Sequence, residues 1–237
     1  ISVTGNGIEI THEDDVPGTA DGTDFGSVYI HNDAVAVTTF TIHNDGNAAL
    51  SLHASSTLRV VVEEDEGATG HLDFTVTTPP ATSTVSVGGS TTFVVTFNPS
   101  ATGIRSAVLT IPNDDYDEDP YTFSIQGTGT DPEISVTGNG IEIIHEDDVP
   151  GTADGTDFGS IDIDNVTATT TFTIHSTGST PLNLHQNSAS RVVVSGEHSS
   201  DFTVTPPATS TVSAGGSTTF VVTFDPTTTK NRSAILS

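Results

Sequence analysis

Residues 1–27 read ISVTGNGIEITHEDDVPGTADGTDFGS, and residues 134–160 repeat them with one change, Ile144 in place of Thr11. The repeat runs from residue 1 to residue 134, an offset of 133 residues. This offset matches an ordinary domain and exceeds the repeats of solenoids and propeller blades, so each copy is expected to bury its own core. Near-identity over a whole loop indicates recent duplication, as in genes for stalks and surface fibres.

Apolar and polar residues alternate in short segments throughout the chain. In TTFTIH, residues 38–43, Phe40 and Ile42 share one face and the threonines share the other. No window of about a dozen residues shows helical spacing, and turn residues separate the segments. The pattern predicts an all-β fold, with two tandem immunoglobulin-like antiparallel β-sandwiches end to end. In the first copy we expect strands at 1–4, 8–11, 27–31, 35–43, 49–53, 58–63, 73–77, 91–97, 106–111 and 121–126.

The alternation also predicts the core. We expect the segment 40–43 to form a hairpin with 50–53 about Gly46, so that Leu50 and Leu52 face Phe40 and Ile42. The predicted core of the first copy adds Phe74, Phe93, Val95, Phe97, Leu109, Ile111 and Phe123. Its counterparts in the second copy are Phe172, Ile174, Leu182, Leu184, Phe202, Phe220, Val222, Phe224 and Leu236.

The domain boundary falls in the short segment GTGTDPE, residues 127–133. It divides the chain into 1–130 and 131–237. Because the segment is short and Pro132 stiffens it, we expect restricted hinge motion and a rod about twice the length of one domain.

Charge limits the partners. The chain has 31 acidic residues, five basic ones and a net charge of −26. Nucleic acid and anionic membranes both need a basic footprint, so neither is expected to bind. No apolar run is long enough for a spanning helix, and we expect no membrane insertion. There is no cysteine, so disulfides and thiol chemistry are excluded.

Several motifs resemble a known family of repeats. The segment 177–184, TGSTPLNL, matches the pattern TGxxPLxL, and Phe220 to Pro226 matches FxVTFxP. With PEISVTGNG and the tail NDDYDEDPYTFSIQGTGT, these motifs resemble the bacterial choice-of-anchor D domains, which are similar to the immunoglobulin-like family of ASPM, SPD-2 and Hydin. The resemblance covers nearly all of both copies. It implies an immunoglobulin-like sandwich in large secreted or surface-anchored bacterial proteins, and it implies no catalytic residues.

The repeated acidic loop is the first candidate site. Calcium takes six to eight oxygen ligands, which carboxylates and loop carbonyls supply. The alternative is a loop whose aspartates cap turns. We consider a calcium site formed in the two copies by Asp14, Asp15, Asp21 and Asp24 and by Asp147, Asp148, Asp154 and Asp157.

A second candidate, Asn113 to Pro120, has the opening spacing of an EF-hand, but Pro120 stands where glycine is required. The motif is therefore rejected, although a looser calcium site at this hairpin stays open. His43 and His53 are expected to be surface histidines too far apart to share zinc. No nucleophile elbow is present, and we expect no enzyme and no catalytic residue.

These observations favour a structural module of a large extracellular bacterial surface protein, forming a rod-like shaft, stalk or fibre. Neighbouring repeats or identical subunits would be its partners. The alternative is a calcium-dependent adhesin or carbohydrate-binding module that recognises surface glycans. Its ligand-reading loop would lie where the copies differ in length, at Glu63 to His71 against Ser195 to His198.

The last hairpin of the first copy, with its strand at 121–126, has no counterpart in the second copy. Either the missing residues belong to a longer natural chain, or a strand from another molecule fills the gap. We favour the first explanation, because the second requires a dedicated donor segment. Under the second, the chain would be a filament subunit completed by its neighbour.

Overall fold

The computed structural model describes residues 1–31, 34–65, 70–163 and 166–237. The chain divides into two compact units, Ile1–Asp131 (unit 1) and Pro132–Ser237 (unit 2). The expected boundary lay one residue earlier. Among the described residues there is no α-helix, and the only helical turns are short 3₁₀ segments, so the expected all-β fold is confirmed. No helix in this part of the chain is long and apolar enough to span a membrane.

The first sheet of unit 1 has the strand order β2-β1-β4-β9-β7, and all its neighbouring pairs are antiparallel. Asn6 and Gly7 form the turn between β1 and β2 with positive φ angles of 52° and 77°, as a tight hairpin requires. The strands are β1 (Ser2–Gly5), β2 (Ile8–Ile10), β4 (Ala36–His43), β7 (Phe74–Thr78) and β9 (Ser90–Phe97).

The second sheet of unit 1 has the order β3-β11-β10-β6. Its strands are β3 (Asp24–Tyr29), β6 (Val61–Glu63), β10 (Gly103–Ile111) and β11 (Tyr121–Thr130). β10 and β11 form a long antiparallel hairpin, whereas β3 runs parallel to β11. The expected sandwich was purely antiparallel. The difference arises because β3 and β11 are connected through most of the unit, and such a crossover permits a parallel pair.

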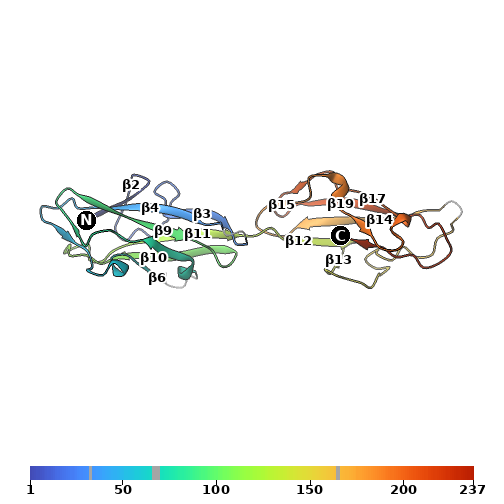
Figure 1. Cartoon of the computed structure of the whole chain (residues 1–237), viewed down its shortest axis with the longest axis horizontal. Helices are drawn as coiled ribbons and strands as arrows, with labels where there is room; N and C mark the ends of the chain where they lie inside the picture. Colours follow the sequence, from blue (N-terminus) through green and yellow to red (C-terminus); the bar gives the residue numbers. More distant parts are fainter. Residues whose placement is uncertain (32–33, 66–69, 164–165) are drawn as a thin grey trace. The chain divides into compact units, whose positions relative to one another are not determined.

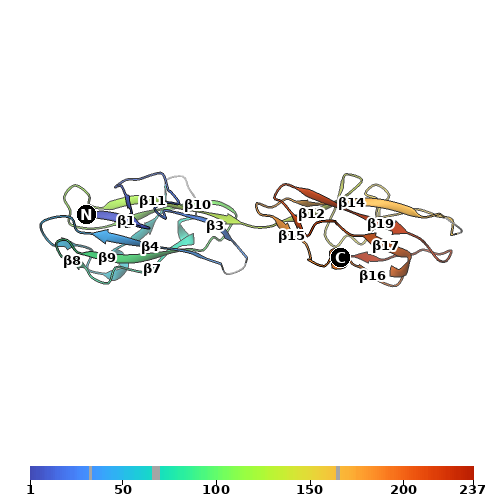
Figure 2. The ribbon, with the colours of Figure 1, turned by 90° about the horizontal axis from the view of Figure 1, so that it is seen from above.

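The two sheets pack face to face around one core (Figures 1 and 2). Phe40 of β4 stacks on Phe93 of β9 with ring centroids 5.3 Å apart, and its ring lies 5.5 Å from that of Phe123 in the opposite sheet. Every core residue predicted for the first copy is buried.

The expected hairpin about Gly46 is wrong. β4 pairs with β1 and β9, whereas β5 (Leu50–Ser51) pairs with β8 (Thr84–Val85), a strand that sequence patterns missed. The side-chain amide of Asn44 explains the change of direction. It donates to the carbonyl oxygens of Ala48 and Val85, both at 2.8 Å, and so directs the chain toward β8. Leu50 and Leu52 are nevertheless buried.

Unit 2 keeps the first sheet, with the order β13-β12-β14-β19-β17. Its strands are β12 (Ile134–Gly138), β13 (Ile141–Ile143), β14 (Ala168–Ser176), β17 (Phe202–Thr205) and β19 (Ser217–Phe224). The other described strands form two short pairs, of β15 (Leu182–Asn183) with β18 (Thr211–Val212) and of β16 (Val194–Ser195) with β20 (Ile235–Leu236). The full second sheet of unit 1 has no equivalent among these residues.

Burial in unit 2 follows from this difference. Phe172, Ile174, Phe220, Val222 and Phe224, all in the retained sheet, are buried as predicted. Other predicted core residues are only half-buried, namely Leu182, Leu184 and Phe202. Leu236 is exposed, so its prediction as a core residue is wrong in this structure; nothing described packs over it as β11 packs over its counterpart in unit 1.

Candidate functional site

The acidic loop of unit 1 is held by its own aspartates. Asp14 Oδ1 accepts a hydrogen bond from the backbone of Val16 at 3.0 Å, and Asp24 Oδ1 accepts one from Gly26 at 2.8 Å. Asp21 Oδ1 accepts from both the backbone and the hydroxyl of Thr23, at 3.0 and 2.6 Å. These are Asx turns, in which a carboxylate replaces a backbone acceptor two residues before the donor.

Unit 2 repeats the same turns. Asp147 Oδ1 accepts from the backbone of Val149 at 3.0 Å, and Asp157 Oδ1 accepts from that of Gly159 at 2.8 Å. Asp154 accepts from the hydroxyl and backbone of Thr156, and these hydrogen bonds hold the pKa of its carboxyl below the ordinary value. The remaining members of the predicted set, Asp15 and Asp148, are exposed.

In unit 1 the loop also extends the second sheet. The backbone N–H of Glu13 donates to Thr122 O at 2.7 Å, and that of Ser124 donates to Asp14 O at 2.8 Å. The side-chain amide of Gln126 donates to Asp24 Oδ2 at 3.0 Å. The first turn of the acidic loop is therefore docked along β11, and part of its charge is used to hold that position.

The described residues contain no group of three or more acidic or histidine side chains placed to hold a metal ion. Within each loop the aspartates serve separate turns. Calcium binding here stays a prediction, and backbone carbonyls would have to supply a large share of the ligands.

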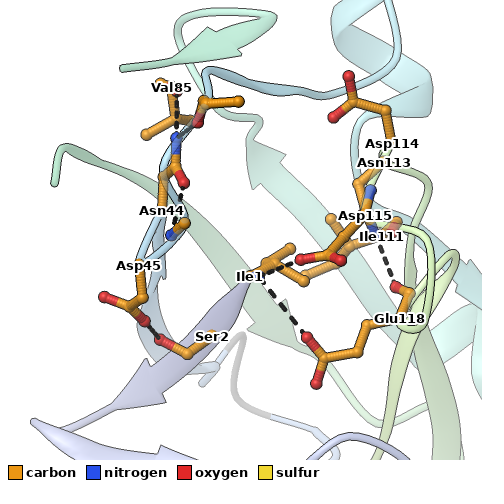
Figure 3. A network of polar contacts seen from close by, with 12 residues as sticks. Ile1, Ser2, Asn44, Asp45, Val85, Ile111, Asn113, Asp114, Asp115 and Glu118 are labelled. Atoms are coloured by element: carbon orange, nitrogen blue, oxygen red, sulfur yellow. Dashed lines mark hydrogen bonds and ion pairs between the residues drawn. The ribbon is translucent and has the colours of Figure 1, made fainter. Parts of the chain in front are cut away.

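The acidic hairpin between β10 and β11 forms a polar network (Figure 3). The side-chain amide of Asn113 donates to the carbonyl oxygens of Ile111 and Glu118 at 2.9 and 2.8 Å. Asp114 Oδ1 accepts from the backbone of Ser51 at 2.7 Å, which lowers the pKa of the Asp114 carboxyl. Asp115 Oδ2 lies 2.7 Å from the α-ammonium group of Ile1. The hairpin carboxylates therefore tie the hairpin to neighbouring segments.

All four arginines are used inside the fold, which the sequence analysis missed. Arg59 donates to the carbonyl oxygens of His53, Ala54 and Pro80 at 3.1, 3.1 and 2.6 Å. Arg191 makes the same three bonds in unit 2, to His185, Gln186 and Pro207. The signal was available, because both arginines precede the same Val-Val-Val run in the two copies.

The other two arginines form matched ion pairs. Arg105 Nε lies 2.5 Å from Asp73 Oδ2, and Arg232 is hydrogen-bonded in the same way to Asp201. The bond from Arg232 is the largest cause of a lowered pKa at the Asp201 carboxyl. Both aspartates are buried. The guanidinium groups therefore do not neutralise the acidic surface, and they leave no basic patch for a ligand.

The histidines serve separate local contacts. His43 Nε2 is hydrogen-bonded to Thr4 Oγ1 at 3.1 Å, and His53 Nδ1 accepts from the backbone of Ser55 at 3.1 Å. His175 repeats the first contact with Thr137 at 3.0 Å.

Unit 2 has an open hollow of about 490 Å³ on the outer side of its sheet. It contains no Phe, Tyr or Trp side chain on which a sugar ring could stack. The lining residues are Ser135, Thr137, Gly140, Glu142, His175, Ser176, Thr177, Gly215 and Gly216.

The fold and these contacts define a protein of immunoglobulin-like β-sandwich units. The HYDIN/CFA65/VesB-like, Ig-like domain family model matches residues 19–128 and 152–237. The chain belongs to this family, and the resemblance drawn from its motifs is confirmed.

Three solved structures are similar to the chain at low identity. The ASH/PapD-like domain 7 of human CEP192 is 18% identical over 45% of this chain and 82% of that chain, with a TM-score of 0.31. A Porphyromonas gingivalis W83 protein of unknown function is 12% identical over 86% and 80%, with a TM-score of 0.27. The secreted serine protease VesC from Vibrio cholerae is 12% identical over 90% of this chain and 48% of its own, with a TM-score of 0.34. No curated protein matches the sequence.

Proposed function

We propose that the chain is a structural segment of a large extracellular bacterial surface protein, in which repeated immunoglobulin-like units form a shaft, stalk or fibre. The observation that carries this proposal is the repetition of internal contacts. The two units share their arginine cages, their buried ion pairs and their aspartate turns at matched positions. What duplication has preserved is therefore the means of folding one unit.

Charge supports the same proposal. Because every arginine is bound internally, the acidic side chains dominate the surface, with a net charge of −26. Like-charged surfaces repel neighbouring shafts and keep repetitive β-proteins from pairing at their edges. A surface of this kind suits a protein present in many parallel copies outside the cell.

The connection between the units supports a shaft. Only residues 131–133 separate β11 from β12, and one of them is Pro132. A connection this short permits few relative orientations of two folded units. Each repeat would therefore add a fixed length, and enzymatic activity is not part of the proposal.

Labelling of intact cells tests the location. Antibodies raised against this chain should label the outside of unpermeabilised bacteria that produce the natural protein, and brief external proteolysis should remove the label. An antibody against a cytoplasmic protein is the matched control. Labelling that appears only after permeabilisation would contradict the proposal.

A further inference from the structure

β11 is the strand that completes unit 1. It lies between β10 and β3, and its side chains Tyr121, Phe123 and Ile125 are all at most 2% exposed. Phe123 lies against Phe40 of the opposite sheet, and Tyr121 lies against His12 with ring centroids 5.1 Å apart. The strand therefore closes the core and holds the acidic loop at the same time.

In unit 2, no described residue occupies the corresponding position. The side chain of His12 is 24% exposed in unit 1, whereas that of His145 is 95% exposed. Leu109 is fully buried in β10, whereas its counterpart Leu236 is 38% exposed. The residues that line the place of β11 are present in unit 2, and they face solvent.

The backbone shows the same gap. The four residues DFGS begin β3 in unit 1, where β3 pairs with β11. The same four residues at 157–160 form no strand in unit 2. Identical sequence thus adopts two structures, and the difference follows from the pairing partner, because an unpaired edge leaves its N–H and C=O groups without ladder bonds.

We propose that unit 2 is a strand acceptor, which binds one extended segment between residues 157–163 and β20 and thereby forms its second sheet. β-Strand addition of this kind gains main-chain hydrogen bonds along the strand and specificity from alternate side chains. The inference concerns unit 2 alone and does not depend on the proposed shaft.

The occupant is a second copy of the repeat's own β11 sequence, YTFSIQGTGT. The residues that contact β11 in unit 1 recur around the gap, with Phe97 as Phe224 and His12 as His145. The fit is specific at Gly127, since a Cβ atom there would lie 2.4 Å from the ring of Phe97. An occupant therefore needs an aromatic or aliphatic residue at the first, third and fifth positions and glycine at the seventh.

The test uses the full chain with residues 112–130 copied after Ser237. Amide hydrogen exchange of residues 157–163 should slow at least tenfold relative to the original chain, to a rate close to that of β3. Exchange in β3 itself should not change. The matched control carries serine in place of the copied Phe123 and Ile125, and it should leave residues 157–163 unprotected.

A second arm adds the blocked peptide Tyr121–Thr130 to the original chain. A peptide that slows exchange of residues 157–163, while its Gly127→Val form does not, supports acceptance of a separate strand. Protection in the fused chain alone also supports the proposal, because tethering raises the effective concentration of the strand. Unchanged exchange in the fused chain would overturn it, as would equal protection by the serine control or closure of the gap by dimerisation of the original chain.

Discussion

Arg59 and Arg191 each close a loop by donating to three carbonyl oxygens. Arginine suits this position because its planar guanidinium group presents several donors in a fixed arrangement, which lysine lacks. The contact replaces water for carbonyl groups that the loop cannot pair with a strand. One residue type thus orders a segment that has little regular structure.

Replacement of Arg59 by lysine tests this role. Arg59→Lys should lower the unfolding free energy of unit 1 by about 1–3 kcal/mol, because it leaves buried acceptors without donors. All three tyrosines lie in unit 1, so denaturant unfolding followed by tyrosine fluorescence reports on that unit. The matched Arg191→Lys change in unit 2 should leave the tyrosine transition in place. Equal effects of the two variants on that signal would contradict the assignment.

The pair of Asp201 and Arg232 predicts sensitivity to acid. The folded-state pKa of the Asp201 carboxyl is lowered, chiefly by the hydrogen bond from Arg232. Its stabilising contribution is therefore complete above the unfolded pKa, near 4, and is lost as the pH falls through the folded pKa. Calorimetry should show that Asp201→Asn destabilises unit 2 near neutral pH and weakens the pH dependence below pH 4. The exposed Asp148→Asn is the control, and a steeper acid transition in Asp201→Asn would be the wrong sign.

At the scale of elements, β11 connects the sheet, the core and the acidic loop of unit 1. The strand must pass close to Phe97, which explains Gly127 better than turn formation does. Gly127→Ala should therefore destabilise unit 1 by about 1–3 kcal/mol through overpacking. The neighbouring Thr128→Ala should change the unfolding free energy by less than about 0.5 kcal/mol. Comparable losses in the two variants, measured by urea unfolding, would show that crowding at Phe97 is not the cause.

Tyr121 makes the same strand sensitive to alkali. Burial raises the pKa of its hydroxyl from 10.0 to about 12, and the hydroxyl donates to the carbonyl oxygen of Ile10. Because the folded-state pKa lies above the unfolded value, this contribution is complete below pH 10 and is lost between pH 10 and 12. Unit 1 should lose stability in that interval, and absorbance should show one tyrosine that ionises late. A Tyr116→Phe variant should keep the late titration, whereas Tyr121→Phe should abolish it.

The sequence predicted most strands because their apolar residues alternate without interruption, as in β4 and β9. It failed at the connection after β4, where the side chain of Asn44 turns the chain toward β8. Alternation reports which face a residue occupies, and it does not report which strand is the neighbour. The aspartates of the candidate calcium loop were correctly found as a group, but their division into separate turns depends on backbone geometry that composition does not encode.

For the whole molecule, the strongest long-range electrostatic effect is repulsion among the acidic side chains. The net charge of −26 disfavours the compact state, and salt screens that repulsion. The melting temperature should therefore rise between 10 mM and 1 M sodium chloride on general grounds. Calcium chloride at matched ionic strength provides the control for a specific site. A melting temperature that falls with sodium chloride would contradict the electrostatic explanation.

Small-angle scattering from this two-unit chain tests the proposed shaft most directly. A shaft predicts a maximum dimension about twice that of a single unit, and a profile that changes little with temperature below unfolding. Insertion of a flexible Gly-Ser linker after Asp131 should broaden the distribution of distances, which makes it the matched control. A compact profile for the original chain, or one indistinguishable from that of the linker variant, would contradict the proposal that the repeats form a shaft.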